Sequence, residues 1–175
     1  PDSYTPKHLA EKILTSKSAL EGERKQVTVL FADVSGFTSL SEQVDPEDVH
    51  TLMRKMFELM LGEVHRYEGT VNQFLGDGIM ALFGAPIAHE DHAHRALRAA
   101  LGIRKVLEEY QAELQEKRGM RFQMRQGLNT GLVVVGSIGD DLRMDYTAVG
   151  DTTNLAARLQ QTADPGRIVI AEATH

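Results

Sequence analysis

The stretch VTVLFADVSGF, from Val27 to Phe37, decides the fold and supplies the first reactive group. Its apolar run is too short for a typical helix and predicts a buried strand that delivers Asp33 at its end. Gly36 then allows a tight turn, so the backbone amides of residues 35 to 37 can face an anion in front of a helix expected from about Thr38. The alternative is that Asp33 only caps that helix, which is the commoner role for an isolated motif of this kind.

Composition limits the function classes. A chain of 175 residues with 42% hydrophobic content can bury one sizeable core, so we expect one domain. A net charge of -6 and a pI of about 5.6 argue against nucleic-acid binding, which needs clustered Lys and Arg. No apolar stretch approaches the ~20 residues of a membrane span. The absence of cysteine excludes disulfides and zinc-thiolate sites and agrees with a cytoplasmic location, which we expect.

The two ends of the chain suggest a piece of a longer protein. Residues 1 to 25 are polar and charged, with one short helical pattern from His8 to Leu14, and are expected to form an N-terminal connector. Residues 26 to 175 are expected to form the folded domain, with further C-terminal elements beyond position 175.

Hydrophobic periodicity places the remaining elements. Pro46 marks the first turn of a helix, with Asp45 as its expected cap and an apolar face rich in methionine that we assign to the core. Two short apolar runs joined by Gly76-Asp77-Gly78 predict a hairpin. The other expected elements are a helix from residues 89–91 to Gly119, two strand-like halves in 121–137 around Gly127 to Gly131, a short run at 144–149, a helix at 152–161 and a strand at 167–170.

This order predicts an α+β fold with a ferredoxin-like βαββαβ core, an additional helix and strands, and one antiparallel sheet covered by helices on one face. In that topology the first strand lies in the middle, beside the hairpin, and Asp77 comes next to Asp33. Two carboxylates at adjacent strand ends suit a pair of divalent cations about 3.5 to 4 Å apart. Asp77 also has a purely structural alternative, because Asp-Gly is a common hairpin turn.

Three motifs in this order resemble the class III nucleotidyl cyclases, over roughly Arg24 to Ala171. They are Phe31-x-Asp33-x-x-Gly36-Phe37-Thr38, Phe74-Leu75-Gly76-Asp77-Gly78 and Gly150-Asp151-x-x-Asn154-Leu155-Ala156-x-Arg158-Leu159. The connector and the first motif also look like those of bacterial multidomain members with further regulatory domains.

The resemblance implies the site residues. Asp33 and Asp77 would hold two divalent cations, Mg or Mn, and Asn154 and Arg158 would orient the ribose and stabilise charge at the phosphates. The nucleotide-binding positions implied are Val34, Ser35, Gly36, Phe37, Thr38, Gln73, Arg125 and Thr147. Arg125 matches an arginine that contacts phosphates in relatives, although it could equally pair with an acid on a strand.

The implied reaction converts ATP to cyclic AMP and pyrophosphate by attack of the ribose 3'-hydroxyl on the α phosphorus. The family geometry also implies a homodimer with shared active sites. Gln73 stands where family members that use ATP usually carry Lys. Thr147 stands where many of them carry Asp. A glutamine amide both donates and accepts, so it can pair with adenine or guanine. Adenine is our first choice, and a guanylate cyclase is the alternative.

Two other function classes compete with an active cyclase. One is a cyclase-like nucleotide-binding or regulatory domain with little or no turnover. Gln73 supports it, and the retention of Asp33, Asp77, Asn154 and Arg158 opposes it. The other is a different two-metal enzyme, such as a diguanylate cyclase or polymerase palm, but those lack the motif from Asn154 to Arg158. The polar cluster His89, Glu90, Asp91, His92 and His94 could suggest a separate metal site, but its position at a helix start favours capping.

Overall fold

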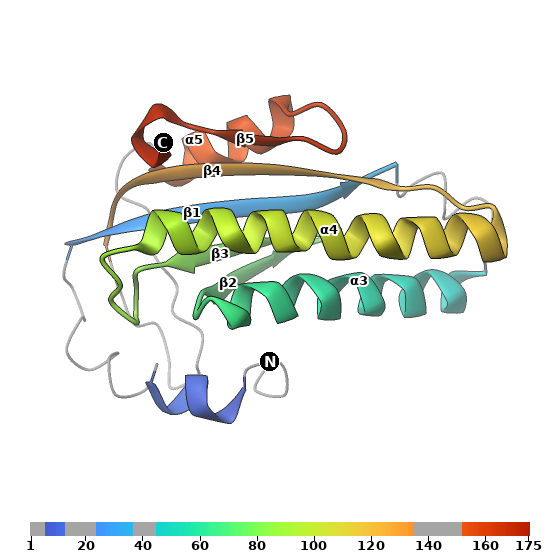
Figure 1. Cartoon of the computed structure of the whole chain (residues 1–175), viewed down its shortest axis with the longest axis horizontal. Helices are drawn as coiled ribbons and strands as arrows, with labels where there is room; N and C mark the ends of the chain where they lie inside the picture. Colours follow the sequence, from blue (N-terminus) through green and yellow to red (C-terminus); the bar gives the residue numbers. More distant parts are fainter. Residues whose placement is uncertain (1–5, 13–23, 37–44, 135–151) are drawn as a thin grey trace.

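A computed structural model describes residues 6–12, 24–36, 45–134 and 152–175 of the chain (Figure 1). Its centre is a five-stranded sheet in the order β2-β3-β1-β4-β5. The strands are β1 (Arg24–Ser35), β2 (Thr70–Leu75), β3 (Gly78–Phe83), β4 (Gln123–Val134) and β5 (Ile168–Ile170). The predicted α+β class, the hairpin and the central place of the first strand are confirmed. The helix expected from Thr38 and the strand expected at 144–149 lie outside the described residues.

Strand direction departs from the expected antiparallel sheet at one edge. The pairs β1–β3, β1–β4 and β2–β3 are antiparallel, whereas β4 and β5 run parallel. Between β4 and β5 the chain passes through α5 (Thr152–Thr162). Parallel neighbours need a crossover of this kind, usually a helix, because a tight hairpin only joins antiparallel strands.

Two long helices cover one face of the sheet. In Figure 1, α3 (Pro46–Arg66) and α4 (His92–Arg118) lie side by side in front of the strands. Met56 and Met60 are fully buried in the core that these helices form with β1 and β3, so the methionine stripe is core, as predicted. Pro46 does open α3, but the Asp45 side chain makes no capping hydrogen bond.

The third helix covers the other face, which the sequence did not lead us to expect. Ala156 of α5 is buried with Val29 and Phe31 of β1, whose side chains point away from α3 and α4. Gly127 makes this contact possible, because a Cβ there would lie 2.3 Å from the Gln160 backbone nitrogen. Burying both faces of β1 explains why its sequence is almost continuously apolar.

The predicted break in the fourth strand is wrong. β4 is one continuous strand of 12 residues, and Gly127 and Gly131 pair within the ladder with Phe31 and Val27 of β1. Glycine in a strand suggested a turn, but here it marks close approach of a helix: a Cβ at Gly131 would lie 2.6 Å from the Thr152 hydroxyl oxygen.

The N-terminal segment packs on the domain through a short helix at residues 7–12, drawn in blue in Figure 1. Leu9 is fully buried and contacts the buried Ile87. Lys12 forms an ion pair with Glu68, in the turn that follows α3. The connector therefore makes specific contacts with the folded domain.

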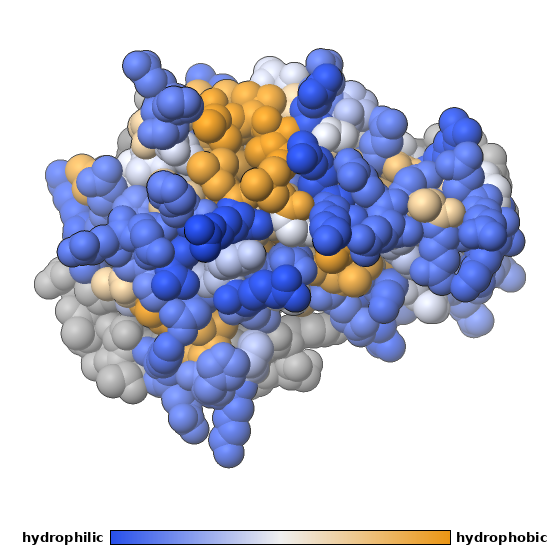
Figure 2. Space-filling view, viewed as in Figure 1, coloured by the Kyte–Doolittle hydropathy of each residue, from blue (hydrophilic) through white to orange (hydrophobic). Residues whose placement is uncertain are grey.

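Polar side chains cover most of the face seen in Figure 2, and an apolar area is exposed at the side where β5 lies. All three residues of β5 are partly exposed. This edge of the sheet is thus less well covered than its centre.

Candidate active site

The end of β1 brings together the two predicted metal ligands. Asp33 pairs in register with Gly78 of β3 on one side and with Arg125 of β4 on the other. The Val34 N–H donates to the Asp77 carbonyl at 3.1 Å, which joins the hairpin turn to the end of β1. Asp77 thus lies next to Asp33, as the predicted topology required.

Gly78 allows this close approach. A Cβ at this position would lie 2.5 Å from the Ala32 carbonyl oxygen and 2.8 Å from the Asp33 Cβ, so any larger residue would push the hairpin away. The sequence indicated Gly78 only as part of a turn. Its dependence on the neighbouring strand could not be read from the local pattern.

Asp33 is partly withdrawn from water. Its side chain is 23% exposed, and Oδ2 accepts a hydrogen bond from Arg125 Nη2 at 3.4 Å. Oδ1 is buried and has no hydrogen-bond partner among the described residues. Burial raises the pKa of Asp33; the Arg125 guanidinium opposes this and the nearby Asp77 carboxylate adds to it. The charged form of Asp33 is therefore not fully compensated by the protein itself.

Arg125 connects Asp33 to the last turn of α5. Its Nη1 donates to the Gln161 carbonyl at 3.1 Å while Nη2 contacts the Asp33 carboxylate. Of the two interpretations of Arg125, the structure shows the pairing with an acid. Contact with a nucleotide phosphate stays a prediction.

Gln160 is a residue of this site that sequence reasoning missed. It is 6% exposed, its Nε2 has no hydrogen-bond partner among the described residues, and its amide helps to lower the pKa of Asp33. The amide faces the carboxylate without a hydrogen bond of normal geometry. A glutamine at the end of an amphipathic helix carries no signal of this kind in the sequence.

The group at the end of β1 fits a divalent cation site. Magnesium takes oxygen ligands, uses only one or two protein carboxylates and completes its shell with water and phosphate. Asp33 and Asp77 supply such a pair, and the buried Asp33 Oδ1 is a carboxylate oxygen without a donor among the described residues. The described part of the chain holds no group of three or more His, Cys, Asp or Glu side chains placed to bind a metal ion.

The other predicted residues lie on exposed surface. Asn154 and Arg158 are both exposed on α5, on the face opposite to the buried Ala156 and Gln160. Gln73 is exposed on β2, next to an irregularity in the pairing with β3. Asn154 and Arg158 therefore point away from the side of α5 that meets Asp33.

The expected phosphate cradle is described only in part. Gly36 is exposed with a φ of 78°, a conformation that favours glycine. The Val34 N–H is engaged with Asp77 and is not free for a phosphate. Phe37, Thr38, Thr147 and the Ser35 side chain fall outside the described residues.

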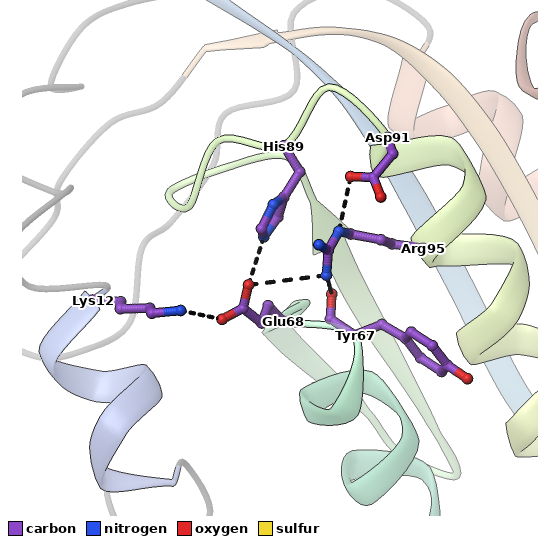
Figure 3. A network of polar contacts seen from close by, with 6 residues as sticks. All are labelled: Lys12, Tyr67, Glu68, His89, Asp91 and Arg95. Carbon is purple, nitrogen blue, oxygen red and sulfur yellow. Dashed lines mark hydrogen bonds and ion pairs between the residues drawn. The ribbon is translucent and has the colours of Figure 1, made fainter.

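The histidine-rich start of α4 has protein partners (Figure 3). His89 Nε2 lies 3.0 Å from Glu68 Oε2, and Arg95 Nε donates to Asp91 Oδ1 at 2.9 Å. Arg95 also donates to the Tyr67 carbonyl at 3.3 Å. The cluster thus joins the turn after α3 to α4 and the N-terminal helix, which supports its structural interpretation over a metal site.

The described helices include none with the length and apolarity needed to cross a membrane. Residues 21–175 match the family model described as the adenylate and guanylate cyclase catalytic domain. Adenylate cyclase 1 of Rhizobium meliloti is 37% identical over 171 residues, covering 96% of this chain and 26% of that protein. This chain therefore spans about a quarter of that curated relative.

Solved structures agree with the sequence comparison. The adenylyl cyclase CyaB from P. aeruginosa superposes with a TM-score of 0.79 at 34% identity, over 87% of this chain and 79% of that one. A non-canonical dimeric guanylyl cyclase domain of a fusion protein from the aquatic fungus Blastocladiella emersonii gives a TM-score of 0.77 at 31% identity, over 89% of this chain and 84% of that one. Cyclase domains of this family use divalent metal ions, which agrees with the oxygen donors at Asp33 and Asp77. The chain belongs to the adenylate and guanylate cyclase catalytic domain family.

Proposed function

We propose that this domain converts ATP to cyclic AMP and pyrophosphate. The observation that carries the proposal is the position of Asp33 and Asp77 at adjoining strand ends, with a buried Asp33 oxygen that lacks a hydrogen-bond donor among the described residues. Membership of the cyclase family supports it. The 3'-oxygen forms a bond to the α phosphorus, the bond from that phosphorus to the bridging oxygen breaks, and the hydroxyl proton leaves to solvent.

Asp33 and Asp77 are the residues that would hold two divalent cations, Mg or Mn. When bound, such cations acidify the ribose hydroxyl and offset the charge that moves onto pyrophosphate. We propose that the protein supplies the rest of the anion site through the turn at Gly36, the backbone of the cradle from Ser35 to Thr38, and the guanidinium of Arg125 beside Asp33.

Asn154 and Arg158 are proposed to act in the site of a second copy of the chain. Gln160 and Ala156 occupy the side of α5 that faces the sheet and Asp33, and a shift of two positions turns a helix by about 200°. Arg158 is therefore directed away from Asp33 of its own chain. In a homodimer with two shared sites, Arg158 can act in catalysis although it points away from Asp33 of its own chain.

The base is proposed to contact Gln73 and Thr147, with adenine preferred and guanine as the alternative. Gln73 is exposed and free to meet a ligand, but its amide can match either base by rotating. Discrimination by one such amide should be modest, because strong rejection requires leaving a buried polar group unpaired. A GTP-specific activity would make the guanylate cyclase alternative correct.

The direct test is to incubate the purified chain with ATP or GTP and Mn²⁺ or Mg²⁺ and to separate the products by chromatography. We expect cyclic AMP to exceed cyclic GMP, and Asp33→Ala and Asp77→Ala each to abolish turnover with the circular dichroism spectrum unchanged. Near-normal activity in either variant would refute the metal assignment. Binding of nucleotide without turnover would favour the regulatory-domain alternative.

Two further parts of the proposal concern the N-terminal segment and the location of the reaction. Residues 1–25 are proposed to be a connector that carries signals from regulatory domains of the same chain, and the contacts of Leu9 and Lys12 support this. We place the reaction in the cytoplasm, where ATP is available.

A further inference from the structure

The last turn of α5 packs against Asp33. Gln160 is 94% buried, since its exposed fraction is 6%, and its Nε2 lacks a hydrogen-bond partner among the described residues. Asp33 Oδ1 is also buried without a partner in the same part of the chain. The Gln160 amide acts on the Asp33 carboxylate and opposes the rise in its pKa, so this donor and this acceptor lie in one contact between α5 and the end of β1.

A second link joins the same two elements. Arg125 contacts Asp33 Oδ2 through one guanidinium nitrogen and the Gln161 carbonyl through another. The planar guanidinium fork fixes the direction of both contacts. The end of α5 is thus connected to the Asp33 carboxylate from two sides.

α5 is also held along its length. Thr152 Oγ1 donates to the Leu132 carbonyl at 3.0 Å, and the Asn129 side chain donates to the Thr152 carbonyl at 3.0 Å. At the other end, Gly127 lets Gln160 approach β4 closely. A movement at Asp33 should therefore shift α5 as one body, together with Asn154 and Arg158 on its exposed face.

We propose that Gln160 is a positioning residue for Asp33, and that α5 couples the occupation of Asp33 by a cation to the placement of Asn154 and Arg158. The inference rests on the proposed function for its metal and for the roles of those two residues. Asp33 Oδ1 has two lone pairs, so it can bind a cation and still accept from the Gln160 amide, whereas a cation that also draws on Oδ2 competes with Arg125. Loading should therefore loosen the Arg125 contact and leave Gln160 as the main group that orients the carboxylate. In a dimer with shared sites, a cation at Asp33 of one site would then change the position of the Asn154 and Arg158 side chains that serve the second site.

The first test measures Mn²⁺ binding to the purified chain by calorimetry, without nucleotide. Gln160→Met keeps the length of the side chain and removes the amide, and should weaken Mn²⁺ binding about tenfold or more, the usual cost of losing a group that orients a metal ligand. Gln115→Met, at an exposed position of α4, is the matched control and should bind as the wild type. Melting temperatures identify any variant that is merely unfolded.

The second test reads α5 itself by NMR. The side-chain amide signal of Asn154, assigned by its loss in Asn154→Ser, should shift when Mg²⁺ is titrated into the wild type. In Gln160→Met the shift at saturating Mg²⁺ should be reduced. This measurement does not depend on turnover. If Gln160 only contributed to packing, its replacement would not change the Mg²⁺-dependent shift of the Asn154 signal.

The outcomes separate the two proposals. Mn²⁺ affinity that Gln160→Met leaves unchanged, or an Asn154 signal that does not respond to Mg²⁺, overturns the inference even if the domain is an active cyclase. An effect of Gln160→Met on both readouts supports it even if turnover proves slow. If the wild type and the Asp33→Ala variant bind Mn²⁺ with equal affinity, both the metal assignment of the proposed function and this inference are wrong.

Discussion

Gly78 is the residue on which the meeting of Asp33 and Asp77 depends most directly. A Cβ at this position would lie 2.5 Å from the Ala32 carbonyl oxygen, which is backbone and has little freedom to move. We predict that Gly78→Ala lowers the free energy of unfolding by about 1 to 3 kcal/mol, as overpacking does, and reduces turnover by displacing the hairpin. Urea unfolding and the product assay measure the two effects.

Gly62→Ala is a control substitution that should change the free energy of unfolding in the opposite direction. It lies in the interior of α3, exposed, and a Cβ added there would meet nothing within 4 Å. Gly62→Ala should therefore raise stability by about 0.5 to 1 kcal/mol, because it reduces the entropy lost when the helix forms. Equal effects of the two substitutions would show that the contact at Gly78 does not exist.

The sequence predicted the charged members of the site better than the neutral ones. Asp33 follows a buried apolar run and Asp77 sits in a recognisable turn, so each has a local signal. Gln160 and Gly78 act through residues far away in the sequence, Asp33 in both cases. Their roles follow from the packing of two elements and have no local pattern.

At the scale of elements, a buried chain of hydrogen bonds crosses the sheet near the start of α4. His92 Nδ1 lies 2.8 Å from the Thr28 hydroxyl, which lies 2.9 Å from that of Thr130, which in turn lies 3.0 Å from that of Thr174. These groups join α4, β1, β4 and the 3-10 helix η2 (Glu172–Thr174). The contact of His92 with Thr28 places a titratable ring at one end of this series of hydrogen bonds.

Burial lowers the pKa of His92, while the Asp91 carboxylate opposes this and His89 adds to it. Below the ordinary pKa of 6.5 the unfolded chain binds a proton more readily than the folded one. The free energy of unfolding therefore decreases as the pH falls below this value, by at most about 1.4 kcal/mol per pH unit for one proton. We predict that His92→Gln makes the free energy of unfolding less dependent on pH between 7 and 5.

The measurement is urea unfolding at several pH values. His65, whose pKa burial also lowers, should keep part of the pH dependence in the variant. His94→Gln, two positions from His92 and exposed, is the matched control. A His92→Gln profile parallel to that of the wild type would contradict the assignment.

Element type was predictable where periodicity was strong, as in α3, α4 and the hairpin, and failed where glycine had a tertiary purpose. Gly127 and Gly131 suggested a break in the strand, but they lie within β4 where the absence of a side chain lets α5 pack closely. The face that α5 covers was also missed, because its buried side is small: Ala156 and Gln160. A helix that packs through an alanine and an amide leaves a weak apolar pattern.

At the scale of the whole molecule, the two faces of α5 argue for an assembly. Gln160 lies against Asp33 of its own chain, and Arg158, two positions earlier, is exposed on the other side. If Arg158 acts in catalysis, the site it serves belongs to another copy. Regulatory domains would then need only to shift one copy against the other, because a catalytic site tolerates little displacement.

Mixing two inactive variants tests this arrangement. Asp33→Ala removes a metal ligand from both sites of a homodimer, and Arg158→Ala removes the guanidinium from both, so each should be inactive alone. In a mixed dimer, Asp33 of one chain and Arg158 of the other survive together in one site. About half of randomly paired dimers are mixed and each has one intact site of two, so activity should recover to about a quarter of wild type. A mixture that stays inactive after subunit exchange has been demonstrated, for example by energy transfer between labelled copies, would mean that Arg158 does not act across a dimer interface.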